Sequence, residues 1–410
     1  MSTPSSWADG LPTRVSDWPI ERQCLIHLLR VALGMELRVE LKAQCSTIRV
    51  PRLMQEIQRH RVGAYLAHRL PPDIVGFFPP RLGAGLKRIA GQTQLNALRQ
   101  TAGLARLAGM FAKEGLSVMS LKGPLLAQEL HGNQGVRHAG DIDFSIRKAD
   151  VLRADALLRE NGFRRTHPAG DMSPHKWKRY AEVWRDCEYN NSQEKLSVEV
   201  MWRLANINAL QAQAEVDPAV EHVAAGVTIR ALPREVHVVY LLVHGANHGW
   251  FRLFWLVDIA ILMRAEATNW KRMHDLAVAS GVERHYWQGL CLARDILGAP
   301  WPEGLMDAPT TRELAKNIED AYWQLELSLE EFKFGASHYR KAKYARRLMP
   351  DLGMQWREMS KRWISPDNWQ HMPLSDRWFA LYYVVWPVLW AWRQVAKRLW
   401  PKGPPAASTD

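Results

Sequence analysis

The sequence predicts an α+β protein in which a mixed sheet and its helices lie between two helical regions. Apolar residues recur at three- and four-residue spacing from residue 20 to about 115 and again after Pro233, which is the helical period. Between these regions, short alternating stretches bounded by turn residues indicate strands. We therefore expect a flexible lead at 1–19, a helical region at 20–115, a sheet-bearing core at 116–230, a helical region at 231–400 and a disordered tail at 401–410.

The composition is that of a globular protein with a basic surface. The 410 residues are enough for a sizeable core, and 54 Lys and Arg against 42 Asp and Glu give a net charge of +12. This charge favours anionic partners, and we expect a nucleotide, not nucleic acid. The four cysteines form no CxxC pair, the polar N-terminus does not resemble a signal peptide, and no run approaches the ~20 apolar residues of a spanning helix. A cytoplasmic protein with reduced thiols is the expectation.

The N-terminal region is expected to consist of helices separated by prolines. Three stretches carry the helical period, and pairs of prolines at 71–72 and 79–80 interrupt them. The three stretches are 21–33, 51–70 and 86–115.

The core region alternates strands with short helices. GPLLAQELHG at 123–132 predicts a brief helix with a proline in its first turn, where a missing N–H costs little. A second, amphipathic helix is predicted over 148–163 and ends at Asn-Gly. The strand candidates are LSVMSL (116–121), DIDFSI (141–146) and two segments, 181–191 and 195–204, around the turn NNSQEK.

After Pro233 the sequence predicts four helices, at 234–250, 252–265, 269–281 and 283–298. Further on, FALYYVVWPVLWAW is an apolar stretch of 14 residues between two arginines. We interpret it as a helix packed on the protein and kinked by its proline. The alternative is a peripheral contact with a membrane surface through a tryptophan stripe, formed by Trp378, Trp386, Trp390 and Trp392.

Two acidic residues interrupt the strand candidate DIDFSI. Asp141 and Asp143 alternate with Ile142 and Phe144, so the carboxylates point to one face of the strand and the apolar side chains to the other. Burying two neighbouring carboxylates without a partner is costly, but Mg²⁺ takes carboxylate and phosphate oxygens as ligands. The pair therefore predicts a metal–triphosphate site, where a divalent ion supports in-line attack on phosphorus.

An isolated DxD is more often a solvated surface strand, but its surroundings favour a metal site here. Gly123 lies between a predicted strand and a predicted helix, where it lets a phosphate approach the backbone N–H groups of a helix N-terminus. Lys122 and Arg137 lie near enough in the sequence to add positive charge to a nucleotide-binding site.

A third acid is expected on a neighbouring strand. Glu199 is flanked by apolar residues in LSVEVMWRL, so it is the acid most suited to point from this strand into a polar site. Asp186 and Glu188, on the strand before, are its competitors.

These segments resemble the nucleotidyltransferase superfamily that includes DNA polymerase β, with its pattern of a glycine turn, DxD and a third acid. More closely, the chain is similar to the uncharacterised bacterial nucleotidyltransferase family NTP_transf_5. The similarity covers roughly 50–390 and is carried by QRHRVGAYLAHRL (58–70), SLKG (120–123), R-x3-DIDF (137–144), VEVMWRL (198–204), HGANHGWFRLFWLVDIA (244–260) and SPDNWQHMPLSDRWFALYYVVWPV (365–388).

The resemblance implies a minimal polymerase β-like core and an Mg²⁺- or Mn²⁺-dependent enzyme. It implies transfer of a nucleoside monophosphate, most simply AMP from ATP, to a hydroxyl or phosphate of an unidentified small molecule, peptide or protein. By the same resemblance, Asp141 and Asp143 hold the metal, Gly123 lies in the phosphate turn, and Glu199 is a metal ligand or the base on the acceptor side. The alternative is a catalytically degenerate protein that binds nucleotide, with or without a membrane surface.

A second group of polar residues follows in HGANHGWFR. His244 and His248 share a helix face at the spacing of a zinc pair, but the Glu of H-E-x-x-H is absent. We expect these histidines, with Arg252, to line a substrate cleft between the helical region and the sheet. Asp258, on the next predicted helix, is expected to be the buried partner of a His or an Arg.

Overall fold

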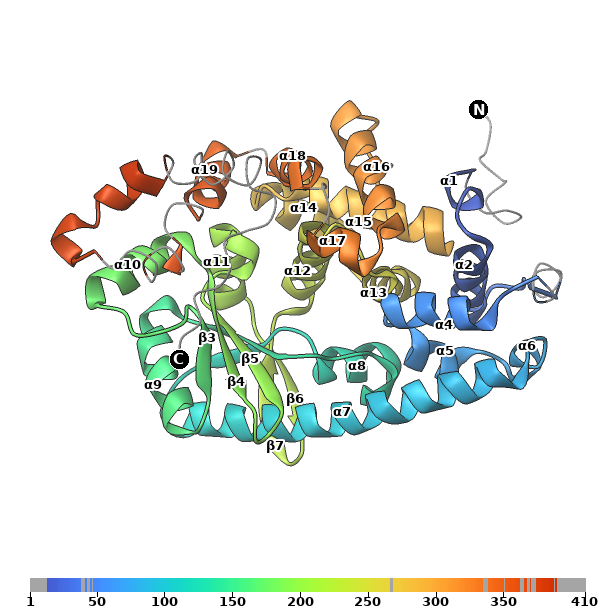
Figure 1. Cartoon of the computed structure of the whole chain (residues 1–410), viewed down its shortest axis with the longest axis horizontal. Helices are drawn as coiled ribbons and strands as arrows, with labels where there is room; N and C mark the ends of the chain where they lie inside the picture. Colours follow the sequence, from blue (N-terminus) through green and yellow to red (C-terminus); the bar gives the residue numbers. More distant parts are fainter. Residues whose placement is uncertain are drawn as a thin grey trace, which may run out of the picture.

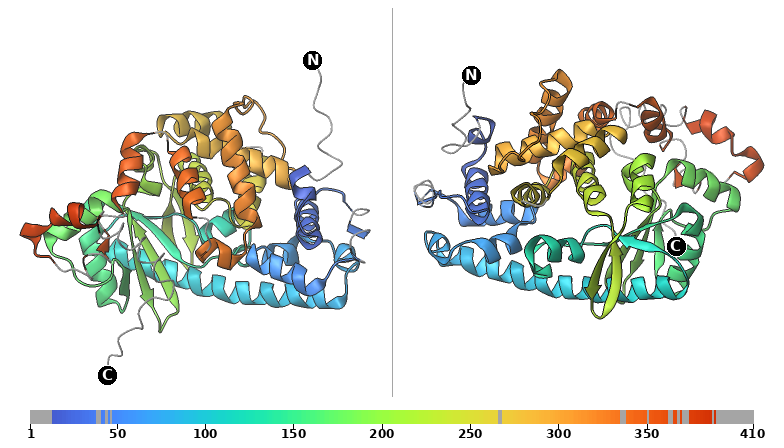
Figure 2. Two further views of the ribbon diagram at one scale, coloured as in Figure 1. Left: turned by 45° about the horizontal axis from the view of Figure 1, so that its top comes forward. Right: turned by 180° about the vertical axis from the view of Figure 1, so that it is seen from behind.

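The computed structural model describes residues 13–37, 41–42, 45, 47–265, 268–334, 338–349, 351–361, 365–366, 369, 374–386 and 388. Within them the predicted α+β architecture is confirmed: a mixed sheet lies between helices from both halves of the chain (Figure 1). The long helix α7 runs along one side of the molecule, and the C-terminal helices lie on the other side (Figures 1 and 2).

The sheet has seven strands in the order β3-β4-β5-β2-β1-β7-β6. The central pair β2·β5 is parallel, as is β1·β7, and the remaining pairs are antiparallel. The strands are β1 Val118–Ser120, β2 Ile142–Ile146, β3 Arg164–His167, β4 Asp186–Asn191, β5 Leu196–Met201, β6 Val220–Ala224 and β7 Val227–Ala231.

The N-terminal helices follow the predicted apolar pattern with two differences. The predicted helix over 51–70 is broken at His60–Val62, where Arg61 has a φ of 57°. The predicted flexible lead is partly folded, since α1 forms and Trp18 is buried with its indole donating to Glu326. The helices are α1 Thr13–Ser16, α2 Ile20–Ala32, α4 Val50–Arg59, α5 Gly63–Arg69, α6 Pro72–Val75 and α7 Pro80–Lys113.

Short helices connect the strands, and one of them corrects a prediction. Residues 181–183, predicted as the start of a strand, are the last turn of α10, and the strand itself begins at Asp186. Both predicted helices of this region form. The helices are α8 Pro124–His131, α9 Val151–Glu160, α10 Pro174–Val183 and α11 Asn208–Val216, with the short 3₁₀ turns η1 Gln134–Val136, η2 Lys148–Asp150 and η3 Leu204–Asn206.

All four helices predicted after Pro233 are confirmed. They are α12 Arg234–Asn247, α13 Leu253–Arg264, α14 Trp270–Ala279 and α15 Glu283–Leu297. Beyond them lie α16 Arg312–Glu326, α17 Leu329–Phe334, α18 His338–Leu348, α19 Leu352–Ser360 and the 3₁₀ turn η4 Asp376–Trp378.

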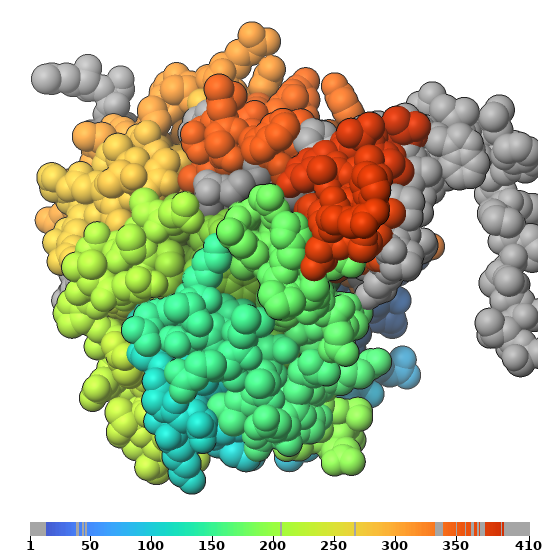
Figure 3. Space-filling view, turned by 90° about the vertical axis from the view of Figure 1, so that its left-hand side faces the viewer, coloured from blue at the N-terminus to red at the C-terminus, as the bar shows by residue number. Residues whose placement is uncertain are grey.

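The C-terminal apolar stretch lies against α10 where the structure describes it. Figure 3 shows the red C-terminal segment on the green segment that contains α10, and the ring of His175 in α10 meets that of Phe379 edge to face at 5.2 Å. Trp386 is buried, whereas Trp378 is 49% exposed. Trp390, Trp392 and the predicted tail at 401–410 lie outside the described residues. Within the described part of the chain, no helix combines the length and the apolar character needed to cross a membrane.

The two faces of the sheet have different neighbours. Ile142, Phe144 and Ile146 of β2 point into a hydrophobic core shared with α7 and α9, where Phe111 meets Phe144 edge to face at 5.4 Å. Because side chains alternate along a strand, Asp143 and Ser145 point to the opposite face. On that face Met201 of β5 accepts a hydrogen bond from Tyr240 of α12. The strand therefore presents its acids toward the C-terminal helices.

Candidate functional site

The three predicted acids converge near the start of β2, on the face of the sheet that is turned toward α12. Asp141 directly precedes β2, and Asp143 of β2 is the register partner of Glu199 in the parallel strand β5. One carboxylate oxygen from each of the three lies within 4.8 Å of the others. The competitor Glu188 is exposed on β4 and does not join this group among the described residues.

Lys122 and Gly123 complete the turn that follows β1. The backbone at Gly123 has a φ of 77°, which favours glycine, and this residue is the N-cap of α8. Pro124 occupies the first helical position, so its missing N–H removes no helical hydrogen bond. Lys122 turns back to the strand, and its Nζ donates to Oδ1 of Asp143 at 2.9 Å. The sequence placed Lys122 near the nucleotide; the structure pairs it with the DxD.

Burial governs the protonation of this cluster. Burial raises the pKa of Asp143, and the Lys122 ammonium opposes that shift. Burial also raises the pKa of Glu199 well above its ordinary value, with the neighbouring charges of Asp143 and Asp186 adding to it. Burial alone would lower the pKa of Lys122, but the charge of Asp143 raises it well above the usual range. Three carboxyl groups share one lysine, so the cluster favours the uptake of protons or of a further cation.

Asp186 has a different role from the three acids. Its carboxylate bonds the guanidinium of Arg185 at 3.0 Å, and Arg185 outweighs the effect of burial, so the pKa of Asp186 is lowered. This ion pair is a neutral neighbour of Glu199. It explains why a buried acid on β4 is not a member of the ligand group.

The donor set fits a divalent cation. Three carboxylates are hard oxygen ligands of the type that Mg²⁺ and Mn²⁺ take. Oδ2 of Asp143 is buried and has no hydrogen-bond partner among the described residues, which is costly unless a ligand meets it. Asp141, Asp143 and Glu199 are the residues that would hold the ion.

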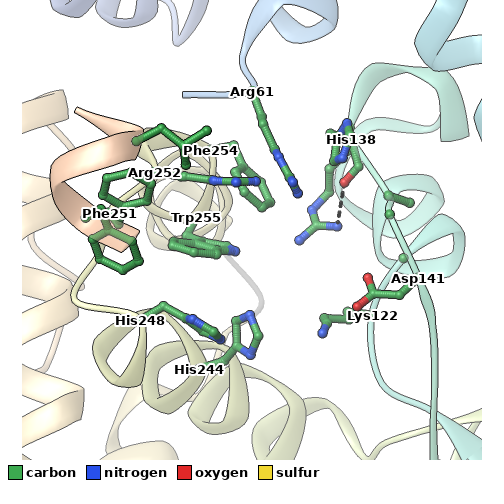
Figure 4. Close-up of a pocket in the computed structure, with 16 residues that line it drawn as sticks. Arg61, Lys122, His138, Asp141, His244, His248, Phe251, Arg252, Phe254 and Trp255 are labelled. Atoms are coloured by element: carbon green, nitrogen blue, oxygen red, sulfur yellow. Dashed lines mark hydrogen bonds between the residues drawn. The ribbon is translucent and has the colours of Figure 1, made fainter. Parts of the chain in front are cut away.

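A cavity of about 280 Å³ opens beside the acids, and it gathers most of the residues singled out in the sequence. Figure 4 shows Lys122 and Asp141 pointing in from one side, with His244, His248 and Trp255 on the other. The candidates that line the cavity are Lys122, Gly123, Arg137, Asp141, His244, His248 and Arg252. The structure thus brings the phosphate turn, the DxD and the predicted substrate cleft to one place.

Arg137 is fixed by an ion pair with Asp258. Its Nε lies 2.9 and 3.1 Å from the two carboxylate oxygens, and both side chains are buried. Its guanidinium also lies over the ring of Phe254, 5.2 Å from the centroid. The expectation that Asp258 is the buried partner of a His or an Arg is confirmed. The pair ties the segment before β2 to α13.

The two histidines are neutral and pack with an indole. Their ring centroids are 4.6 Å apart, and Trp255 stacks on His248 at 5.3 Å. Burial lowers the pKa of His248 to about 4, and it lowers that of His244 well below the ordinary value. Within the described residues, no third metal-ligating side chain forms a group with them. The pair forms a flat, uncharged wall of the cavity.

Sequence reasoning missed several residues that line this cavity, among them Arg61, His138 and Trp255. Arg61 forms no ion pair or side-chain hydrogen bond with the described residues. Arg61 lies at the break between α4 and α5, which the helical period over 51–70 conceals. Trp255 occupies an ordinary apolar position of its helix, so no local pattern distinguishes it. His138 lies in the stretch RHAGD, where its nearness to Asp141 was the available signal.

The fold and the site define a class of protein. A mixed sheet carries three convergent acids beside a glycine turn at a helix N-terminus, an arrangement suited to transfer of a phosphorus group by metal-assisted displacement. The model of the family NTP_transf_5, described as uncharacterised nucleotidyltransferase, matches residues 46–298, which is more than half of the chain. The chain belongs to this nucleotidyltransferase family. No curated protein matches it, and no solved structure does.

Proposed function

We propose that the protein transfers a nucleoside monophosphate, AMP from ATP, to a hydroxyl or phosphate of an acceptor in the presence of Mg²⁺ or Mn²⁺. The observation that carries this proposal is the convergence of Asp141, Asp143 and Glu199 beside a cavity that Asp141 and the glycine turn line. The family match supports nucleotidyl transfer in general, and the site supports the metal dependence.

Each residue has a part in this reaction that follows from its position. Asp141, Asp143 and Glu199 hold the divalent ion, which neutralises charge on the phosphates. Gly123 leaves the N-terminus of α8 open to a phosphate group. Arg61 and Arg252 face the cavity from the helical regions and provide positive charge for the rest of the triphosphate. The alternative role for Glu199, whose pKa is raised by burial, is to accept the proton of an acceptor hydroxyl while Asp141 and Asp143 hold the ion.

The wall opposite the acids supports binding of a flat group. Trp255 and His248 offer apolar faces for stacking, and both are uncharged. We assign the nucleobase to this wall. The described cysteines are all free thiols, which fits a protein that acts on ATP in the cytoplasm. The alternative location is a membrane surface, contacted through the C-terminal segment.

The test is transfer of label from ATP. Purified protein, Mg²⁺ and ATP labelled at the α-phosphorus are incubated with a lysate of the source organism as acceptor pool. We expect a labelled product with the wild type and none with Asp143→Asn. Glu188→Gln is the matched control, because Glu188 lies opposite Glu199 on the next strand but is exposed and outside the acid group. This variant should label the product as the wild type does.

Two other outcomes are informative. If the wild type binds Mg-ATP but labels nothing in any lysate, the protein is the nucleotide-binding module named above as the alternative. If it neither binds nor labels, the acids and the glycine turn do not form a nucleotide site.

A further inference from the structure

We infer that the ammonium of Lys122 takes the place of a second divalent cation, so that the nucleotide complex holds one metal ion per chain and not two. The inference rests on the proposed function, since it concerns the same acids. It starts from one contact, the 2.9 Å bond from Nζ of Lys122 to Oδ1 of Asp143.

Lys122 is held inside the acid cluster. Its side chain is 11% exposed and that of Asp143 is fully buried, so water does not separate the two charges. Lys122 also interacts electrostatically with Asp141, Glu199 and the hydroxyl of Tyr240. An ammonium in this position has the same neighbours as a bound cation would have.

The ligand oxygens leave room for one ion. Where two metal ions act together they lie roughly 3.5–4 Å apart, and a shared carboxylate gives one oxygen to each. Asp143 is the residue best placed to be shared, because it lies between the segment with Asp141 and the strand with Glu199. Its Oδ1 is already bonded by Lys122, and its Oδ2 is the buried oxygen without a hydrogen-bond partner. Because Asp143 has only Oδ2 left to offer, it can bind one metal ion and cannot bridge two.

The charge count points the same way. When a bound metal ion keeps all three carboxyl groups ionised, these groups and one ammonium leave two negative charges, which one divalent ion cancels. The neighbouring Arg185–Asp186 pair has no net charge, so it does not alter this charge count. A second divalent ion would lie against the buried ammonium of Lys122, and only the triphosphate would offset that repulsion. The triphosphate still meets positive charge, because Arg61 and Arg252 line the same cavity.

The experiment counts bound Mn²⁺ by electron paramagnetic resonance. The full chain is saturated with α,β-methylene-ATP, which cannot be cleaved between the α- and β-phosphates, and is titrated with Mn²⁺. We expect one Mn²⁺ per chain for the wild type and two for Lys122→Met, in which the ammonium is lost. Lys122→Arg keeps the positive charge and should stay at one. Lys178→Met, at an exposed lysine of α10, is the control and should also stay at one.

Two Mn²⁺ in the wild type, or one in Lys122→Met, would overturn the inference and leave the proposed function intact. A wild type that binds neither the analogue nor Mn²⁺ would overturn both.

Thermal unfolding is recorded alongside, because removal of Lys122 leaves Asp143 buried and unpaired. The inference expects Lys122→Met to melt at lower temperature than the wild type without metal and to recover most of that loss with Mn²⁺. A loss that Mn²⁺ does not reverse would count against it.

Discussion

Asp258 and Arg137 show how single buried charges position the site. Their carboxylate and guanidinium meet at 2.9 and 3.1 Å, and both residues are buried. Arg137 also lines the cavity, so the ion pair fixes one edge of that cavity from α13.

Asp258→Ala should therefore be strongly destabilising. The change leaves Arg137 buried without its partner, which typically costs about 3–5 kcal/mol. The double variant Arg137→Met with Asp258→Leu removes both charges and should recover much of this loss. Urea unfolding measures both effects. As control, Asp275→Ala breaks the exposed pair with Lys271 and should cost less than about 1 kcal/mol. A loss for Asp258→Ala no larger than this control would contradict the account.

Residues that interrupt a pattern could be found from the sequence. Asp141, Asp143 and Glu199 are acids in apolar strands, and Gly123 lies between a strand and a helix, so each departs from its surroundings. Arg61 does not interrupt the local sequence pattern, because an arginine is common at exposed helical positions. Its direction depends on the break between α4 and α5, which is set by tertiary packing and has no local signal.

At the scale of elements, Trp250 joins the helices α12 and α15. Trp250 follows α12, has a φ of 53° and is fully buried. Its ring packs closely on Gly245 of α12 and Gly289 of α15, and its indole donates to Gln288 at 3.2 Å. This packing holds the turn between His248 and α13, and it explains why glycine occurs within HGANHGW.

Gly245→Ala should destabilise the fold although it improves helix propensity. The added Cβ would lie 2.3 Å from the rigid ring of Trp250, and overpacking of this kind costs about 1–3 kcal/mol. Gly91→Ala in α7 is the matched control, because nothing lies within 4 Å of its added Cβ. That variant should gain up to about 1 kcal/mol from propensity alone. The denaturant midpoints of the two variants and of the wild type measure these changes in stability. Equal changes for Gly245→Ala and Gly91→Ala would show that Trp250 does not confine α12.

The sequence predicted the long elements better than the edge strands. The four helices after Pro233 have sustained apolar periodicity, and all four form. The strand β3 has the sequence RRTH, and only three of the ten side chains in the strands β6 and β7 are buried, so neither carries the apolar pattern of a buried strand. The segment AEV at the end of α10 alternates like a strand, but the helix begun at Pro174 continues through it.

At the scale of the whole molecule, many histidines are buried in the neutral form. Burial lowers the pKa of His60 and of His285 to about 3, and that of His131 and His138 to about 4. In the unfolded chain these groups take up a proton near pH 6.5. Between the two values the unfolded state binds more protons, so stability falls as the pH falls.

The free energy of unfolding should therefore decrease from pH 7.5 to 5.5 by about 1 kcal/mol for each such histidine. The raised pKa values of Asp143 and Glu199 act in the opposite direction, because protonation favours the folded state there. The histidines outnumber these acids, so the net change is a loss. His285→Gln should lose less stability over this range than the wild type in urea titrations. An identical pH dependence in the two proteins would show that His285 does not contribute.

The helical regions and the sheet are more connected than the sequence indicates. The helix α7 begins among the N-terminal helices and ends under the sheet, where Gly103 lets it pack against Leu196 and Ile142 (Figure 1). Apolar periodicity identified this helix but could not show which two surfaces it joins, because contacts between distant segments leave no local signal.

The central claim is that a nucleotidyl group, not a phosphoryl group, leaves ATP at Asp141, Asp143 and Glu199. The most direct measurement compares two identical reactions, one with ATP labelled at the α-phosphorus and the other with ATP labelled at the γ-phosphorus. We expect the product to carry the α-label and the γ-label to appear in pyrophosphate, and we expect Asp143→Asn to abolish both. A product that carries the γ-label, or one that Asp143→Asn still forms at the wild-type rate, would contradict it.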